Sequence, residues 1–499
     1  MRTLRWALAC LLVASGLHAQ RVTVTLLATT DLHGAIYPYD YYTRAPAQRG
    51  LAKIASLVSA VRGQTRNVLL IDCGDTIQGS PLESVYQHYV RTGRLPLGMK
   101  AAGPTLVQDP MMLVMNEMGY EAMVLGNHEF NFGLKNLAKA RSEARFPWLS
   151  ANTVAGPASG VKPFQPYLVK TVAGVKVAII GITTPSIPSW EVPENYRGLK
   201  FRPGVEAAAD TVKLLRERER PDLVVAAVHA GLGDTGENMV TGIASRVPGI
   251  DAVVFGHSHQ REAGRQIGNV LVVQPQNGGA SLARLDFDME KQSQGWKRAA
   301  RRSELIPVRP ETPADPRILE LAKPYHDAAE RYLDRPVAES VVDLDGSLGR
   351  VQDSALVDAI HEVQLHYARA DVSFTALFNP RVRMPKGPVT VRQIAALYLY
   401  DNELYAIEGD GRMVEDALEN AARFYLSCRN PSCDQGPLVN RAVMGYNYDM
   451  AQGVTYEVDL TQPPGRRIRN LAFQGRPLDP GRKLRIAVNN YRAAGSAGY

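Results

Sequence analysis

The sequence contains only four cysteines, no internal repeat and, beyond its first residues, no hydrophobic run long enough to cross a membrane. The lack of a later run of spanning length excludes a protein with several membrane-spanning helices. The lack of repeats and low-complexity tracts excludes solenoid and fibrous architectures. The formal charge of +7 is a mild basic excess and gives no indication of a nucleic-acid polymer as partner. What remains, 45% hydrophobic and 21% charged residues, is ordinary for a soluble globular protein.

The first residues have the pattern of a secretory signal. A basic start over residues 1–5 precedes an apolar stretch over 6–16 and small residues up to Ala19. We expect cleavage after Ala19, so that residues 1–19 are a signal peptide and the protein is exported to the periplasm or the medium. Cys10 has too little sequence before it to serve as a lipoprotein cysteine, so no membrane anchor is expected.

The remaining cysteines differ in what they predict. Cys73 follows an apolar run and is expected to be buried. Cys428 and Cys433 are close in sequence, and export would permit a short-loop disulfide between them. The sequence does not decide whether that disulfide forms.

The order of the predicted elements indicates two domains. Apolar strands alternate with helical stretches over residues 20–305, including predicted helices at 110–118 and 204–220, which is typical of a layered α/β domain. Residues 306–334 combine a proline-rich stretch with helical spacing at 317–332 and are expected to form a linker and connecting helix. A second domain is predicted over 335–499. The length of 499 residues exceeds a single core and agrees with this division.

Five short segments with metal-binding residue types each follow an apolar run that predicts a strand. The predicted strands are Val22–Ala28, Asn67–Ile71, Glu121–Leu125, Asp222–Val228 and Asp251–Phe255. The segments after them are Asp31-Leu32-His33, Gly74-Asp75, Gly126-Asn127-His128-Glu129, His229 and Gly256-His257-Ser258-His259. Because open α/β sheets build their sites where strands end, we expect these segments to lie close together.

Together the segments offer two carboxylates, one amide oxygen and several imidazoles, a ligand set that suits two adjacent divalent ions. Asp75 is the best candidate for a carboxylate that bridges both ions. In an extended segment, side chains two residues apart face the same side, so Asp31 and His33 can bind one ion. His257 and His259 repeat this spacing. The set therefore predicts a dinuclear hydrolase.

Each segment alone has a plainer explanation, because a single histidine after a strand is more often structural and Gly-Asp or Gly-Asn is an ordinary turn. The full ordered set D-x-H, G-D, G-N-H-E, H and G-H-x-H resembles the calcineurin-like metallophosphoesterase superfamily. The resemblance implies an α/β fold with a four-layer αββα first domain. It also implies two divalent ions, of Mn, Zn, Fe, Mg or Co, and makes His128 a catalytic residue rather than a ligand.

The resemblance further implies how the ligands divide between the two ions, with Asp75 shared. One ion is assigned Asp31, His33, Asp75 and His259, and the other Asp75, Asn127, His229 and His257. Spacing alone does not decide which of the last two histidines belongs to which ion. Since every expected ligand is present, the sequence argues against a degenerate, non-catalytic member.

The second domain resembles the C-terminal α/β domain of the exported 5′-nucleotidase family and is expected to bind the nucleotide. The segments that carry this resemblance are 371–374, 395–402, 445–449 and 489–493. Within the family, Tyr-Leu-Tyr-Asp-Asn and Asn-Asn-Tyr-Arg-Ala most resemble the 2′,3′-cyclic-nucleotide 2′-phosphodiesterase/3′-nucleotidase branch. By this resemblance Tyr400 and Tyr491 sandwich the base and Asn402 contacts it. Two aromatic faces hold a base without selecting among bases, which suits broad specificity.

Two further residues are assigned by the resemblance. Arg381 matches by its position a substrate-facing arginine of 5′-nucleotidases, although the Gly-Gly-x-Arg context of that arginine is missing. Asn131 stands where 5′-nucleotidases place an Asp beside the catalytic histidine, and the cyclic-nucleotide branch has Asn there. Asn131 is expected to orient the imidazole of His128.

The implied activity is hydrolysis of 2′,3′-cyclic nucleotides to 3′-phosphates, and then of 3′-nucleotides, by metal-activated water attacking phosphorus in line. Alternatives on the same scaffold are a 5′-nucleotidase, a nucleotide-sugar hydrolase, or a dimetal enzyme acting on sulfur compounds. A non-catalytic exported protein that binds metal or nucleotide is the alternative outside enzymes. Residues 495–499 stop inside the glycine-rich motif after which family members continue, so we expect a truncated sequence or a missing last strand.

Overall fold

Two six-stranded mixed sheets form the framework of the first domain in the computed structural model, which describes residues 20–99, 106–398, 402–428 and 438–499. The first sheet has the order β16 (Gly295–Pro307), β15 (Ser281–Gln292), β1 (Arg21–Thr29), β4 (Val68–Asp72), β5 (Ala122–Val124) and β6 (Trp148–Leu149). The second has the order β13 (Glu262–Ile267), β14 (Val270–Gln274), β12 (Ala252–Phe255), β11 (Leu223–His229), β9 (Val175–Thr183) and β8 (Tyr167–Val172). Strands β1, β4, β5 and β6 run parallel, as do β9, β11, β12 and β14.

The buried side chains of each strand alternate between two hydrophobic cores. In β1, Leu26 lies in the core between the two sheets, whereas Leu27 lies in the core under a helix layer. In β9, Ile179 lies between the sheets and Ile180 on the opposite face. This alternation follows from the two-residue period of a strand, and it explains why these strands are apolar at nearly every position.

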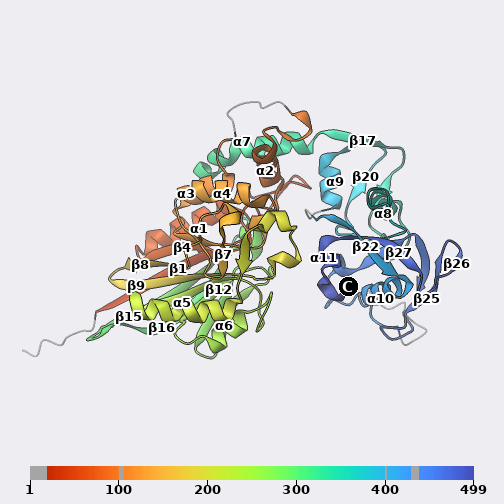
Figure 1. Cartoon of the computed structure of the whole chain (residues 1–499). Helices are drawn as coiled ribbons and strands as arrows, with labels where there is room; N and C mark the ends of the chain where they lie inside the picture. Colours follow the sequence, from red (N-terminus) through yellow and green to blue (C-terminus); the bar gives the residue numbers. More distant parts are fainter. Residues whose placement is uncertain (1–19, 100–105, 399–401, 429–437) are drawn as a thin grey trace, which may run out of the picture.

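Helices cover the outer face of each sheet, so the first domain has the predicted four-layer αββα arrangement (Figure 1). Over the first sheet lie α1 (Leu51–Gln64), α2 (Pro81–Thr92), α3 (Pro110–Met118) and α4 (Gly133–Glu143). Over the second lie α5 (Gly204–Arg218) and α6 (Val240–Arg246). Two short strand pairs complete the domain: β2 (Tyr39–Asp40) with β3 (Ala45–Pro46), and β7 (Thr153–Ala155) with β10 (Leu199–Phe201).

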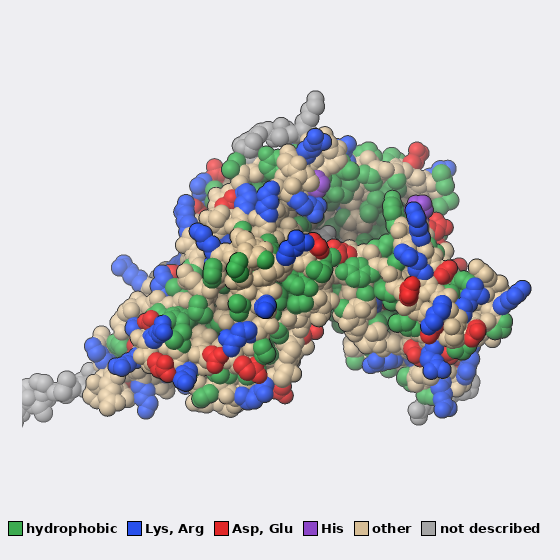
Figure 2. All heavy atoms as spheres, in the orientation of Figure 1, with side chains coloured by type: hydrophobic (Ala, Val, Ile, Leu, Met, Phe, Trp, Pro, Cys, Tyr) green, Lys and Arg blue, Asp and Glu red, His purple; other side chains and the backbone are tan. Residues whose placement is uncertain are grey.

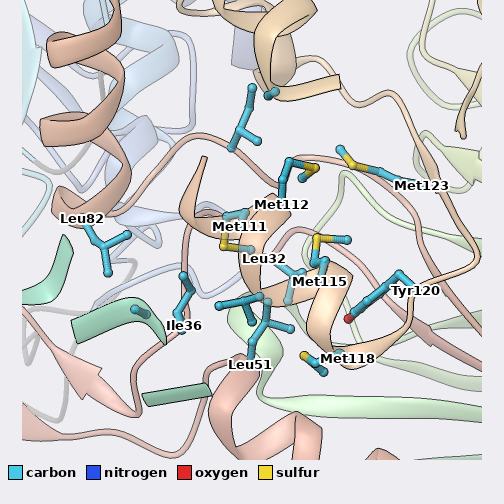
Figure 3. Close-up of a cluster of buried hydrophobic side chains, with 14 of the residues drawn as sticks. Leu32, Ile36, Leu51, Leu82, Met111, Met112, Met115, Met118, Tyr120 and Met123 are labelled. Carbon is cyan, nitrogen blue, oxygen red and sulfur yellow. The ribbon is translucent and has the colours of Figure 1, made fainter. Parts of the chain in front are cut away.

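A methionine-rich core lies under the first helix layer (Figure 3). Helix α3 contributes four buried methionines, and Met123 of β5 adds a fifth. They pack around Leu32 and Leu51, and flexible thioether side chains fill such irregular gaps well. Since Leu32 stands between Asp31 and His33, this core fixes the loop that follows β1.

The sequence located these elements closely. All five predicted strands are confirmed to within one residue at either end, and the helix predicted at 110–118 has those bounds. The helix predicted at 204–220 ends at Arg218. The apolar periodicity that carried these predictions reflects burial, which the structure confirms.

The predicted connecting helix is α7 (Pro316–Leu333). Asp315 caps its first turn by accepting hydrogen bonds from the backbone N–H groups of Arg317 and Ile318. Its apolar face, including Ala322 and Tyr325, belongs to the core of the first domain. Within the described residues, no helix combines the length and apolar character that a membrane crossing needs.

The second domain is built on the four-stranded sheet β22 (Leu404–Asp410), β27 (Lys483–Asn489), β19 (Val372–Ala376) and β23 (Asp449–Gln452). Its helices are α8 (Ala355–Ala368), α9 (Val391–Leu397), α10 (Gly411–Ala422) and α11 (Asn490–Ala493). A three-stranded sheet consists of β24 (Val454–Val458), β25 (Ile468–Phe473) and β26 (Arg476–Pro477). Two strand pairs complete the domain: β17 (Pro336–Ser340) with β21 (Gly387–Thr390), and β18 (Leu344–Asp345) with β20 (Arg383–Met384).

The domains form two lobes with a hollow between them (Figure 2). They meet beyond the linker at α9 and at α11. Arg392 of α9 bonds to the backbone oxygen of Tyr41, and Asn490 of α11 donates to the backbone oxygen of Trp190 at 2.9 Å. Helix α11 therefore faces the first domain (Figure 1).

The cysteines agree in part with expectation. Cys73 is free and buried, as predicted. Cys428 is disulfide-bonded. Cys433 and the signal segment 1–19 lie outside the described residues, so the pairing of Cys428 with Cys433 stays a prediction, as does the signal.

Candidate metal centre

Acidic and histidine side chains gather in two groups of three at the ends of the parallel strands of both sheets. One group is Asp31, His33 and His259, and the other is Asp75, His229 and His257. Within each group the ligand atoms lie within 4.8 Å of one another. The Oδ1 atom of Asn127 lies 3.1 Å from His229 Nε2 and 3.0 Å from His257 Nδ1, next to the second group. The structure thus brings all seven predicted ligands close together, and their division between two ions stays a prediction.

Five of these residues have left-handed backbone, so our expectation that the D-x-H and H-x-H segments are extended is wrong. The φ angles are 50° at Asp31, 48° at His33, 57° at Asp75, 73° at His257 and 53° at His259. Residues with a Cβ rarely adopt this conformation, and each instance costs on the order of 1–3 kcal/mol. The chain turns sharply as it leaves each strand, and this turn, rather than strand alternation, aims the side chains at one point.

One glycine permits the close approach of two of these turns. Gly74 has φ 93°, and a Cβ atom there would lie 2.6 Å from the backbone nitrogen of Gly126. The turn after β4 could not pass the turn after β5 with any larger residue at position 74.

Backbone carbonyls set the tautomers of two histidines. The Nδ1 atoms of His33 and His229 lie 2.9 Å from the backbone oxygen of Gln78 and 2.7 Å from that of Cys73. Since a carbonyl oxygen only accepts, Nδ1 must be the donor in both rings, and Nε2 faces the site. Burial lowers the pKa of His33 to about 4, so this ring is neutral near pH 7.

The charge balance around Asp75 favours its ionised form. Burial opposes ionisation, but the imidazoles of His229 and His128 hold the pKa of Asp75 well below its usual range. In return, the Asp75 carboxylate outweighs burial and raises the pKa of His229 to about 10. Asp75 is therefore a buried carboxylate that favours a positive charge beside it, which the protonated ring of His229 supplies here.

Glu129 supports the turn that carries Asp75, a role the sequence did not reveal. Its buried carboxylate accepts hydrogen bonds from the backbone N–H groups of Gly126 at 2.6 Å, Asp75 at 2.9 Å and Thr76 at 2.6 Å. The G-N-H-E motif contained this residue, but the motif says nothing about which backbone groups it binds. The only signal in the sequence was the presence of an acidic residue within this turn motif.

Glu237 is a second residue that sequence reasoning missed. Its Oε1 atom lies 2.9 Å from His257 Nε2, so Nδ1 is the nitrogen that faces Asn127. A carboxylate on the outer nitrogen of a histidine orients the ring and makes it a better ligand. Glu237 lies in a loop without hydrophobic periodicity, so no pattern indicated it.

His128 lies beside the two groups, with 23% of its side chain exposed, and its Nε2 atom is 4.0 Å from Asp75 Oδ2. Its Nδ1 atom lies 2.6 Å from Oδ1 of Asn131, the contact that the sequence led us to expect. Asn131 also donates to Glu191, a third carboxylate that sequence reasoning missed. Burial raises the pKa of Glu191, opposed by hydrogen bonds from Asn195 and Asn131.

Two of the candidate substrate residues, Asn402 and Tyr491, adjoin Glu403 and Asn490, whose backbone groups are hydrogen-bonded at 3.0 Å. The rings of Tyr491 and Trp190 are stacked, with centroids 6.3 Å apart, and the ring centroids of Trp190 and His257 are 5.5 Å apart. Asn402 donates to the hydroxyl of Tyr398 at 3.2 Å. Arg381 is exposed, and Tyr400 lies outside the described residues. Ring contacts link Tyr491, through Trp190, to the metal-type residue His257.

Two family models match the chain along most of its length. Residues 24–261 match the calcineurin-like phosphoesterases, and residues 336–499 match the 5′-nucleotidase C-terminal domain. A 2′,3′-cyclic-nucleotide 2′-phosphodiesterase/3′-nucleotidase of Salmonella typhimurium is 30% identical over 97% of this chain and 83% of its own length. The chain belongs to the calcineurin-like metallophosphoesterases that carry a 5′-nucleotidase C-terminal domain.

Other relatives and solved structures support the same family assignment. A trifunctional nucleotide phosphoesterase of Bacillus subtilis is 29% identical over 96% of this chain, which spans only 36% of that longer protein. The solved structure of a 5′-nucleotidase precursor from Thermus thermophilus has a TM-score of 0.67 and 26% identity, covering 96% of this chain and 91% of its own.

As a metallophosphoesterase the chain is a hydrolase that acts on phosphoester bonds, and calcineurin-like members use divalent metals. The donor set of this structure fits such ions. In a neutral ring, Nε2 of His33 and of His229 carries a lone pair, and His33 Nε2 lies 3.0 Å from His259 Nε2 while His229 Nε2 lies 3.1 Å from Asp75 Oδ2. Mixed nitrogen and oxygen lone pairs that converge in a buried site suit a transition-metal cation.

Proposed function

We propose that this chain is an exported, metal-dependent 2′,3′-cyclic-nucleotide 2′-phosphodiesterase and 3′-nucleotidase. The observation that carries the proposal is that the candidate metal ligands and a candidate base-stacking residue lie close to each other. The two groups of candidate ligands lie beside His128, and α11 of the nucleotidase-type domain brings Tyr491 to the same place through Trp190. Relatives at about 30% identity are named for these two activities. Export rests on the signal-like start of the sequence.

The proposed metal ligands are those that the sequence indicated. Asp31, His33 and His259 would hold one ion, Asn127, His229 and His257 the other, and Asp75 would bridge them. When bound, two such ions supply positive charge for the phosphoryl oxygens and lower the pKa of water so that it attacks phosphorus near neutral pH. Which of Mn, Zn, Fe, Mg or Co they are is left to the experiment below.

His128 would act on the leaving oxygen. As the oxygen of water bonds to phosphorus, the bond from phosphorus to the ribose 2′ oxygen breaks, and that oxygen takes the proton held on Nε2 of His128. The product is a 3′-phosphate, which would turn in the site and lose phosphate to a second water. General acid catalysis of this kind contributes about 10²–10⁴-fold to rate. Asn131 holds the opposite side of the ring at Nδ1.

The nucleotide-binding roles are proposals for the second domain. Tyr491 and Tyr400 would stack on the two faces of the base, Asn402 would contact its edge, and Arg381 would face the substrate. Tyr491 has the strongest support, because its ring already stacks near Trp190 beside the metal-type residues. Stacking on two aromatic faces favours broad base specificity.

The discriminating experiment is phosphate release from 2′,3′-cyclic AMP, 3′-AMP and 5′-AMP, run side by side after chelation and after return of Mn, Zn or Mg. We expect hydrolysis of the first two and little of 5′-AMP, and activity only with metal. Preference for 5′-AMP would instead support a 5′-nucleotidase, the name that several structural relatives carry. Nucleotide binding without hydrolysis under every metal would support a non-catalytic binding protein.

A further inference from the structure

The segment that follows β9 places a carboxylate behind the candidate catalytic histidine. Glu191 lies between the 3₁₀ turns Ile187–Ser189 and Pro193–Tyr196. One of its oxygens accepts a hydrogen bond from Asn131 Nδ2, and the other accepts one from Asn195 Nδ2 at 2.7 Å. Both carboxylate oxygens of Glu191 are therefore held by amide donors.

This arrangement decides which way the amide of Asn131 faces. A carboxylate only accepts hydrogen bonds, so the NH₂ group of Asn131 must face Glu191, and Oδ1 must face His128. The distance from Oδ1 to His128 Nδ1 is 2.6 Å. Because an amide oxygen also only accepts, the hydrogen-bond network assigns a proton to Nδ1 and leaves Nε2 as the nitrogen on the side of Asp75.

We infer that Glu191 is a positioning residue for this reaction: through Asn131, it keeps an acceptor facing Nδ1 of His128, so that the ring holds its Nδ1 proton when Nε2 gives a proton to the leaving oxygen. This inference rests on the proposed function, because it requires His128 to act on a leaving group. Without Glu191 the Asn131 amide could turn over and present its NH₂ to Nδ1. That nitrogen would then have to be an acceptor, so the single ring proton would stay on Nε2 and the ring could not give it up while keeping a proton on Nδ1. A histidine held in the wrong tautomer loses most of its catalytic effect.

The segment around Glu191 is held from both domains. Asn195 Nδ2 also lies 3.3 Å from the backbone oxygen of Asn131. The two residues that donate to Glu191 are therefore also linked to each other. The preceding residue, Trp190, accepts a hydrogen bond at its backbone oxygen from Asn490 of α11. The contact between the domains thus lies one residue away from the group that orients His128.

The first test compares Glu191→Ala and Glu191→Gln with the parent enzyme. The alanine removes both acceptors, and the glutamine offers one oxygen to two amide donors. We expect kcat for 2′,3′-cyclic AMP to fall about 10- to 100-fold, the usual range for loss of an orienting partner, while KM stays within about twofold. The matched control is Glu194→Gln on the same segment, where the side chain is 67% exposed; its kcat should equal the parent value.

A second substrate separates positioning from general damage. The p-nitrophenolate leaving group needs no proton, so turnover of p-nitrophenyl phosphate by Glu191→Ala should change by less than about threefold. Equal losses on both substrates would overturn the inference and make Glu191 merely structural.

A paired substitution tests the direction of the hydrogen bonds. Asn131→Asp alone would face two carboxylates toward each other and should lose activity. In Asn131→Asp with Glu191→Gln, the new amide at position 191 donates to the new carboxylate at 131 and accepts from Asn195, and the carboxylate accepts the Nδ1 proton of His128. Every partner is satisfied, so the double variant should recover to within about tenfold of the parent. A double variant as inactive as Asn131→Asp would count against the proposed chain of hydrogen bonds.

Nitrogen-15 NMR of histidine-labelled enzyme gives a readout that does not depend on activity. With the His128 signals assigned by their loss in His128→Ala, the parent should show protonated Nδ1, and Glu191→Ala should shift the ring toward protonated Nε2. An unchanged tautomer together with an unchanged kcat would refute the role of Glu191. If the parent hydrolyses no nucleotide, the proposed function fails, while the tautomer comparison still decides whether Glu191 positions His128.

Discussion

At the scale of single residues, the candidate metal centre combines strained backbone with buried charge. Asp75 shows both: its φ is 57°, and its carboxylate is 1% exposed. The strain is balanced by hydrogen bonds from its surroundings, since Glu129 binds the Asp75 N–H and the N–H of His128 donates to Asp75 Oδ1 at 2.8 Å. Backbone strain of this kind persists only where neighbouring groups fix it.

Alanine substitutions at Asp75 and at His128 should show which residue binds metal and which acts in catalysis. Asp75→Ala is expected to abolish hydrolysis and to lower bound metal from about two ions per chain, because the bridging carboxylate is lost. His128→Ala is expected to lose about 10²–10⁴-fold in kcat while keeping its metal. Metal analysis and kinetics of both purified variants check this, and loss of metal from His128→Ala would show that His128 is a ligand.

The sequence predicted the residue types at the centre and the supporting Asn131, but not the carboxylates that support the centre. Asp31, Asp75 and the histidines stood out because each follows a strong strand pattern. Glu191 and Glu237 lie in loops where neither hydrophobic period nor spacing carries information, and their partners are distant in sequence. The left-handed backbone was missed because the positions that adopt it carry Asp and His, residue types that do not by themselves indicate a positive φ.

At the scale of elements, α8 shows how burial couples a helix to pH. His361 of α8 is 2% exposed and lies 3.0 Å from the hydroxyl of Ser373 in β19. That hydroxyl donates to Gln364 at 2.7 Å, so His361 Nδ1 must donate to it. Burial lowers the pKa of His361 to about 4. The helix is therefore packed around a neutral imidazole.

Acid should weaken the second domain through His361. Its folded pKa of about 4 lies below the ordinary value of 6.5, so the unfolded state binds the proton first and stability falls as pH drops from 6.5 to 4. The full loss is roughly 3 kcal/mol. His361→Gln keeps a donor without titrating and should flatten this part of the curve, whereas His366→Gln, an exposed position on the same helix, should not. Urea unfolding at several pH values measures both, and parallel curves for His361→Gln and the parent would contradict the assignment.

At the scale of the whole molecule, contacts of α9 and α11 tie the second domain to the first outside the linker. Asn490 and Tyr491 of α11 reach Trp190 beside the candidate metal centre, and Arg392 of α9 reaches the loop at Tyr41. The sequence predicted the two domains and the helix between them. It did not predict these contacts, because they join residues hundreds of positions apart and each depends on a single polar or aromatic group.

Tyr491 should matter for nucleotides and not for small substrates. If its ring stacks on the base, Tyr491→Ala should lower kcat/KM for 2′,3′-cyclic AMP roughly 5- to 100-fold, the equivalent of one lost stacking contact. Turnover of bis-p-nitrophenyl phosphate, which has no base, should stay nearly unchanged, and Tyr491→Phe should resemble the parent. Equal losses on both substrates would mean that Tyr491 supports the structure instead.

Arg392 should determine how cooperatively the two domains unfold. Its guanidinium is buried at 7% exposure and bonds to Asp334 at 2.7 Å and Glu330 at 3.2 Å, both on or next to α7, as well as to the backbone of Tyr41. Arg392→Ala removes one donor from each of these acceptors. Since Asp334 keeps its pair with Arg44 and is about half exposed, we expect a loss of about 1–3 kcal/mol.

The matched control is Arg383→Ala, which removes an exposed pair with Asp345 inside the second domain and should cost no more than about 1 kcal/mol. Because Arg392 joins elements of both domains, its loss should also split the calorimetric unfolding transition into two, one for each domain. Arg383→Ala should leave the shape of the transition as in the parent. A single, unshifted transition in Arg392→Ala would show that α7 packing alone couples the domains, since the apolar face of that helix lies in the core of the first domain.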